Sequence, residues 1–154
     1  KLNPFTEETV TFGEADNFDY ELEDYEEDES YLEPEDNEVA FFSLFTGLFN
    51  IDNPRTLVRL HNTLTILKGL YPSCLNDEEV FKGYIFFIFL YEWLSQSDCS
   101  ELSSVMDNFL KGNVVEHAEL TDIYNYYSKE IKLLSHDISA MTYRVSRLSL
   151  PIGN

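Results

Sequence analysis

The sequence predicts an all-α protein, a bundle of about five helices preceded by a long acidic and mostly irregular arm. At 154 residues, with 44% apolar and 15% aromatic residues, the chain is long enough and apolar enough to form one domain with a hydrophobic core. Helix periodicity governs the sequence from Asn37 onward. The formal net charge of −19 divides into about −16 over residues 1–54 and about −3 over residues 55–154. We therefore predict an acidic arm or insertion at 1–38 and a helical bundle at 39–154.

The acidic arm holds fourteen carboxylates among the twenty-five residues from Glu14 to Glu38. Runs of like charge repel one another and usually stay solvated, so this segment is unsuited to bind a nucleic-acid backbone. Large apolar side chains interleaved with carboxylates favour an interaction with a basic partner, in which the aromatic rings act as anchors. The candidate interaction residues are Phe18, Tyr20, Leu22, Tyr25, Tyr31 and Leu32. The alternative is a solvated linker whose aromatic residues attach the arm to its own bundle.

The first two helices are expected at 39–49 and 54–70. The first segment, VAFFSLFTGLF, is apolar enough to be largely buried. Asn53 is suited to cap the second helix, and Pro54 fits its first position, where the missing N–H costs nothing. Pro72 lies just beyond the end of this helix.

The third helix is expected at about 80–94, after a start signal in the NDEE at 76–79. Its central run, VFKGYIFFIFLYEWL, is almost entirely apolar and resembles a membrane span. It is bounded by charged residues and is shorter than the roughly 20 residues that a bilayer requires. We therefore predict a central core helix, followed by a fourth, shorter helix at about 100–110.

A fifth helix is expected over the long segment from about Glu116 to Arg147, before Pro151. Apolar residues recur there at alternating three- and four-residue steps, which is typical of an amphipathic helix. They are Ile123, Tyr127, Ile131, Leu134, Ile138, Met141 and Val145. A helix of this length is expected to pack along the bundle and to continue past it.

Cysteine and histidine residues show no pattern that indicates a metal site. Cys74 and Cys99 lack CxxC spacing, so we predict neither a disulfide nor a structural zinc site. The three histidines are scattered, and His61 lies beside the leucine face of its helix, where partial burial is expected. No serine lies in a nucleophile motif, so the chain shows no self-contained active site.

Two arginines open the second helix of a chain that has no other Lys or Arg after Lys1 up to that point. At 100° per residue, Arg55, Arg59 and Asn62 fall on one stripe of the helix, opposite its leucines. Two guanidinium groups and an amide near a helix N-terminus form a candidate anion site. Ion pairing within the chain, with the carboxylates of the arm, is the alternative explanation.

Residues 41–70, FFSLFTGLFNIDNPRTLVRLHNTLTILKGL, resemble the segment near the C-terminal end of the P-loop NTPases of the KAP family and, more loosely, the helical lids of AAA+ and STAND ATPases. There an apolar helix leads into the pattern N-P-R-x-h-x-R-h-x-N, where h is apolar. The matching residues are Asn53, Pro54, Arg55, Leu57, Arg59, Leu60 and Asn62.

The resemblance implies that Arg55 is a sensor-type residue that points toward the terminal phosphates of ATP when the lid closes. It also implies that Arg59 and Asn62 position the helix or contact the core domain. Since no GxxxxGK[ST] motif occurs here, ATP and Mg²⁺ would bind only together with a P-loop domain upstream in the same chain. The bundle would then be lid-like and the acidic arm an insertion before it. Because the sequence begins with Lys1, we expect it to be a piece of a longer polypeptide.

Three functional hypotheses follow. The first is a helical lid or regulatory fragment of a cytoplasmic P-loop ATPase, without independent catalysis. Membrane association of the full ATPase is an alternative that the sequence leaves open. The second is an acidic protein–protein interaction module that binds a basic partner or acts as an acidic mimic. In the third, the arm folds back onto Arg55 and Arg59 and inhibits the ATPase. The expected partners are the upstream nucleotide-binding domain and a basic protein. No direct binding of nucleic acid is expected, and formation of a homo-oligomer is an open alternative.

Overall fold

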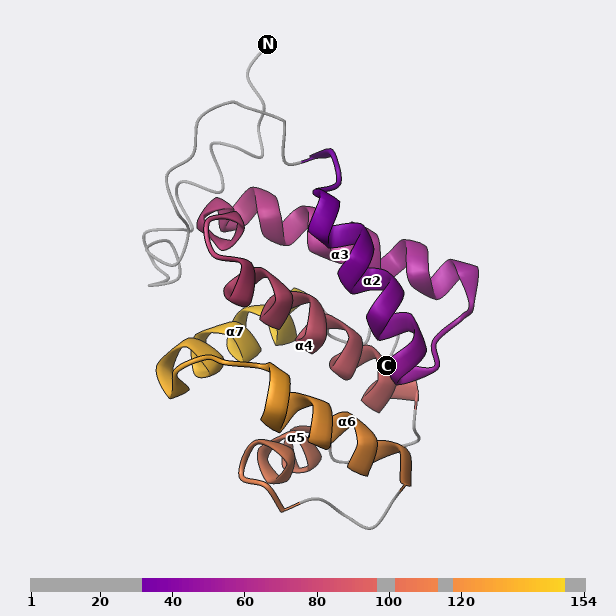
Figure 1. Ribbon diagram of the computed structural model, residues 1–154, viewed down its shortest axis with the longest axis vertical. Helices are drawn as coiled ribbons and strands as arrows, with labels where there is room; N and C mark the ends of the chain where they lie inside the picture. Colours follow the sequence, from indigo (N-terminus) through magenta and orange to yellow (C-terminus); the bar gives the residue numbers. More distant parts are fainter. Residues whose placement is uncertain (1–31, 97–101, 114–117, 149–154) are drawn as a thin grey trace, which may run out of the picture.

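The computed structural model describes residues 32–96, 102–113 and 118–148, and these residues form α-helices joined by short loops (Figure 1). The described residues contain no β-strand, so the predicted all-α bundle is confirmed. Its elements are α2 (Asp36–Phe49), α3 (Pro54–Leu70), the 3-10 turn η3 (Pro72–Leu75), α4 (Glu78–Gln96), α5 (Leu102–Leu110), α6 (Ala118–Glu130) and α7 (Ser135–Leu148).

Helix α4 lies at the centre of the bundle, between α2 and α3 on one side and α6 and α7 on the other in the view of Figure 1. It packs against α2, α3, η3 and α7. Every residue from Gly83 to Leu90 is buried, which explains why this stretch is apolar around the whole helix rather than along one stripe. The predicted core helix is confirmed, and none of the helices in the described ranges is long and apolar enough to cross a membrane.

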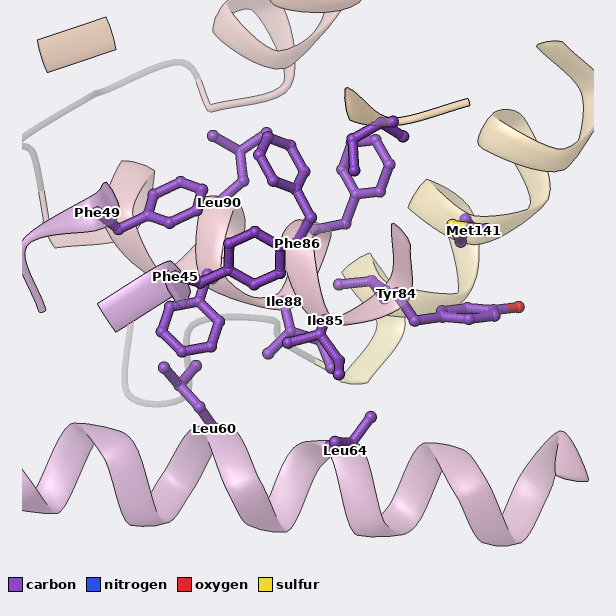
Figure 2. Packing of buried hydrophobic residues seen from close by; sticks show 14 of the residues in the cluster. Phe45, Phe49, Leu60, Leu64, Tyr84, Ile85, Phe86, Ile88, Leu90 and Met141 are labelled. Carbon is purple, nitrogen blue, oxygen red and sulfur yellow. The ribbon is translucent and has the colours of Figure 1, made fainter. Parts of the chain in front are cut away.

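Aromatic rings fill the core around Phe86. Its ring lies edge-on to Phe45, with centroids 5.7 Å apart, and its centroid is 5.4 Å from that of Phe49 (Figure 2). Since Phe45 and Phe49 belong to α2 and Phe86 to α4, these rings pack the two helices together. Leu60 and Leu64 project from α3 toward α4 in the same view. Burial of each such side chain contributes about 1.5–3 kcal/mol, and each aromatic pair adds about 0.5–1.5 kcal/mol.

Local hydrogen bonds set the starts of the helices. Asn53 caps α3 as predicted, because its Oδ1 accepts the backbone N–H of Arg55 at 2.8 Å, and α3 has the predicted bounds. Helix α2 begins at Asp36, three residues before the predicted start. There Glu35 and Glu38 form a reciprocal capping box, in which each side chain accepts the other residue's backbone N–H.

The prediction of a single long helix over 116–147 is wrong, because the structure contains two helices, α6 and α7, joined by residues 131–134. An unbroken helix of about 32 residues would extend about 48 Å and would carry its second half away from the core. The break turns α7 back onto α4, and this buries Met141 and Val145. Leu134, which was predicted on the apolar stripe, is exposed at the break.

Candidate binding site

An apolar pocket of about 350 Å³ lies between α2 and α3. It is lined by Pro34, Glu38, Val39, Phe42, Leu57, Val58 and His61. Val39 and Val58 are 62% and 59% exposed, so the pocket opens to the surface between them. We call this feature the α2–α3 pocket.

A buried ion pair joins the two helices beneath the pocket. Lys68 is 0% exposed and donates from Nζ to Glu38 Oε1 at 2.9 Å, while Glu38 itself is only 1% exposed. Burying two charges is unfavourable unless they are paired and hydrogen-bonded, so this contact strongly constrains how α2 packs on α3. Lys68 Nζ also donates to the backbone oxygen of Glu33 at 3.4 Å, which holds the chain preceding α2 against α3.

His61 completes the polar part of the pocket wall. Its Nδ1 lies 3.2 Å from Glu38 Oε2, which is close enough for an ion pair when the ring is protonated. The contact is not aligned as a hydrogen bond, and Glu38 Oε2 has no other partner among the described residues. The ring of His61 packs edge-on against Phe42, with centroids 5.8 Å apart. The expected partial burial of His61 is confirmed.

The predicted stripe of Arg55, Arg59 and Asn62 is exposed on α3, opposite its buried leucines. The arginines differ in their surroundings. The Arg59 guanidinium donates to the carboxylate of Glu92 on α4, which also accepts from Gln96 Nε2 at 2.7 Å. Arg59 therefore has an ion-pair partner within the bundle rather than a free guanidinium.

Arg55 makes no ion pair with any residue in the described ranges. Its backbone N–H, however, is bound to Asn53 Oδ1, which also accepts the N–H of Thr56 at 3.4 Å. These two N–H groups, which an anion at the helix N-terminus would use, are thus satisfied by the cap. The side chain of Arg55 remains exposed and available to an external group.

The predicted interaction residues of the arm fall mostly outside the described residues. They are Phe18, Tyr20, Leu22, Tyr25 and Tyr31. Leu32 is described and exposed, and Pro34, two residues further on, lines the α2–α3 pocket. The arm therefore joins the bundle beside the pocket.

Other titratable side chains have structural surroundings. The described residues contain no group of His, Cys, Asp and Glu that is arranged to hold a metal ion. Burial raises the pKa of Tyr84, although its phenol oxygen accepts a hydrogen bond from Arg144 at 2.8 Å. Burial also raises the pKa of Tyr91 and Tyr127 in the core. Cys74 is buried, and Cys99 lies outside the described residues.

Sequence reasoning did not single out Glu38, Lys68, Val39 or Val58, yet the structure brings these residues together. One signal was available for Lys68. It lies eleven positions after Leu57, so the two side chains are only about 20° apart on a helical projection at about 100° per residue. A lysine on the apolar face of a helix indicates a buried counter-charge, although not which residue supplies it.

No protein-family model matches the sequence, and comparisons with curated proteins and with solved structures gave no significant match.

Proposed function

We propose that this chain is a protein-interaction module whose α2–α3 pocket receives an apolar side chain of a partner. The observation that carries the proposal is the convergence of exposed Val39 and Val58 on one apolar pocket. Single exposed apolar side chains are common on protein surfaces, but apolar residues gathered around a concavity are typical of binding sites.

The charge around the pocket supports a partner that combines an apolar anchor with Lys or Arg. Glu33, Glu35 and Asp36, which belong to the last part of the acidic arm, are exposed on either side of Pro34. Basic residues of a partner meet these carboxylates while its apolar anchor enters the pocket. Complementary charge of this kind accelerates association and makes the affinity fall with rising salt.

The affinity of a synthetic leucine–lysine peptide for the full chain tests this proposal. It is measured by fluorescence anisotropy at two salt concentrations. Val58→Asp should weaken binding of the peptide about tenfold or more, because the pocket loses an apolar contact and gains a charge that the anchor must desolvate. Ile66→Asp is the matched control, since Ile66 is 52% exposed on the same helix but does not line the pocket. Its effect should stay within about twofold, a change of about 0.4 kcal/mol.

Two results would contradict the interaction proposal. Equal effects of Val58→Asp and Ile66→Asp would show that the pocket is not the binding site. Equal affinity for a second peptide in which every leucine is replaced by serine would show that no apolar anchor is recognised.

A second proposal, the lid of a P-loop ATPase, is supported by the exposed Arg55 side chain at the start of α3. In a longer polypeptide that carries a P-loop domain beside this chain, Arg55→Ala should lower ATP hydrolysis about 100-fold or more while ATP binding persists. Lys111→Ala is the control, because Lys111 is an exposed cation in the turn directly after α5, far from α3 in sequence. Unchanged hydrolysis in Arg55→Ala rejects the lid.

A further inference from the structure

We infer that residues 18–22, FDYEL, occupy the α2–α3 pocket of their own chain when no partner is bound. This inference rests on the proposed interaction function, because it describes how the same pocket is regulated. It assigns the acidic arm a specific role, that of an internal competitor for the partner.

The arm is attached at the mouth of the pocket. Pro34 lines the pocket, and the hydrogen bond from Lys68 Nζ to the backbone oxygen of Glu33 holds this part of the chain against α3. The twelve residue steps from Leu22 to Pro34 span at most about 40 Å and, as a flexible chain, about 20 Å on average. A segment tethered at this distance is present at an effective concentration of about 1 mM, so even weak intramolecular binding is significant.

The apolar pattern of residues 18–22 suits a pocket of this kind. Phe18, Tyr20 and Leu22 alternate with Asp19 and Glu21. In an extended segment, such alternation places the apolar side chains on one face and the carboxylates on the other. The apolar face of the segment can therefore contact the apolar lining of the pocket, while its carboxylates remain in solvent at the edge of the pocket.

Of the two helices beside the pocket, α3 is the one suited to these carboxylates, because Glu33, Glu35 and Asp36 gather at the start of α2 and would repel them. Helix α3 contains no Asp or Glu, although the chain as a whole carries a net charge of −19. Two of its cations are already used, because Arg59 pairs with Glu92 and Lys68 with Glu38. Arg55 lies about one helical turn before Val58, which lines the pocket, and the side chain of Arg55 is exposed.

A partner must displace this segment to bind. If the arm occupies the pocket about nine-tenths of the time, the apparent affinity for a partner falls about tenfold. Basic residues of the partner also provide new counter-charges for the released carboxylates, which favours partners that are both basic and apolar.

Two triple variants of the full chain test the inference. The arm variant replaces with serine the three apolar residues of the segment, Phe18, Tyr20 and Leu22. The control variant makes the same number of serine replacements nearer the start of the acidic arm, at Phe5, Val10 and Phe12. All six positions precede the described residues, so neither variant changes a side chain of the core of the described bundle.

The first readout is the methyl NMR signals of Val39 and Val58, with Ile66 as a reference outside the pocket. The arm variant should shift both valine signals relative to the unmodified chain, whereas the control variant should leave them unchanged and Ile66 should move in neither. The second readout is the affinity for the leucine–lysine peptide, which should rise about five- to tenfold in the arm variant only.

The outcomes separate this inference from the proposed function. Unchanged valine signals in the arm variant would overturn the inference, even if the peptide binds in a Val58-dependent manner. Signals that move while neither variant binds the peptide would support the intramolecular contact and reject the proposed partner. Valine signals that depend on protein concentration would assign the segment to a second copy of the chain and overturn the intramolecular contact.

Discussion

Replacing Lys68 with Met removes the positive charge from the buried ion pair that joins α2 to α3. Met keeps an unbranched, apolar side chain of similar length, so the loss of packing should be small. The carboxylate of Glu38, which is 1% exposed, then remains buried without its nearest cation. The folded state must either carry this uncompensated charge or open to hydrate it.

The magnitude follows from the geometry of the pair. At 2.9 Å and an effective dielectric constant of about 20, the two charges attract each other by about 6 kcal/mol. Removal of one member of a buried pair typically costs about 3–5 kcal/mol. We therefore expect Lys68→Met to cost about 3 kcal/mol or more.

Urea unfolding of the full chain, followed by the fluorescence of Trp93, measures this cost. Trp93 is the single tryptophan of the chain and lies on the central helix α4. With a urea dependence of about 2 kcal/mol per molar, a loss of about 3 kcal/mol lowers the unfolding midpoint by about 1.5 M.

The double variant Lys68→Met/Glu38→Gln is the control, since Gln keeps the capping box at the start of α2 but removes the charge. It should recover most of the loss, because a neutral pair has no unbalanced charge to desolvate. A cost of less than about 1 kcal/mol for Lys68→Met, or a double variant as unstable as the sum of the two single variants, would show that the buried ion pair does not stabilise the packing of α2 on α3.

Three further predictions concern individual residues. Asn53→Ala removes the cap of α3 and should cost about 1 kcal/mol in thermal unfolding followed by circular dichroism; an unchanged midpoint would argue against the cap. Gly83→Leu should cost about 1–3 kcal/mol in urea unfolding, because even a Cβ there would lie 2.7 Å from Leu133 Cδ1 and 2.9 Å from Met141 Sδ; full stability would contradict this packing. Burial raises the pKa of Tyr84 in the folded state, so the unfolded chain loses the phenol proton first. The stability that Tyr84 contributes should be retained below pH about 10 and lost above it. Tyr84→Phe should therefore lose less stability than the unmodified chain between pH 9 and pH 11 in the same urea assay.

Local signals in the sequence predicted most of the helices. The start of α3 depends on Asn53 and Pro54, whose effects reach only two or three residues along the chain, so its bounds were predicted correctly. The apolar run of α4 was long enough to indicate a core helix on its own. The break at residues 131–134 could not be read in the same way, because the helical period of α6 continues through it.

The sequence by itself determined the fold class, the concentration of acidic residues in the arm, and the face of α3 on which Arg55, Arg59 and Asn62 lie. These properties depend on composition, periodicity and neighbouring residues. Only the tertiary structure decided the partners of the charged side chains. Glu92 and Arg59 are 33 positions apart, and Glu38 and Lys68 are 30 apart. Such contacts, like the pocket between Val39 and Val58, exist only once two helices pack, and helix packing depends on side chains far apart in the chain.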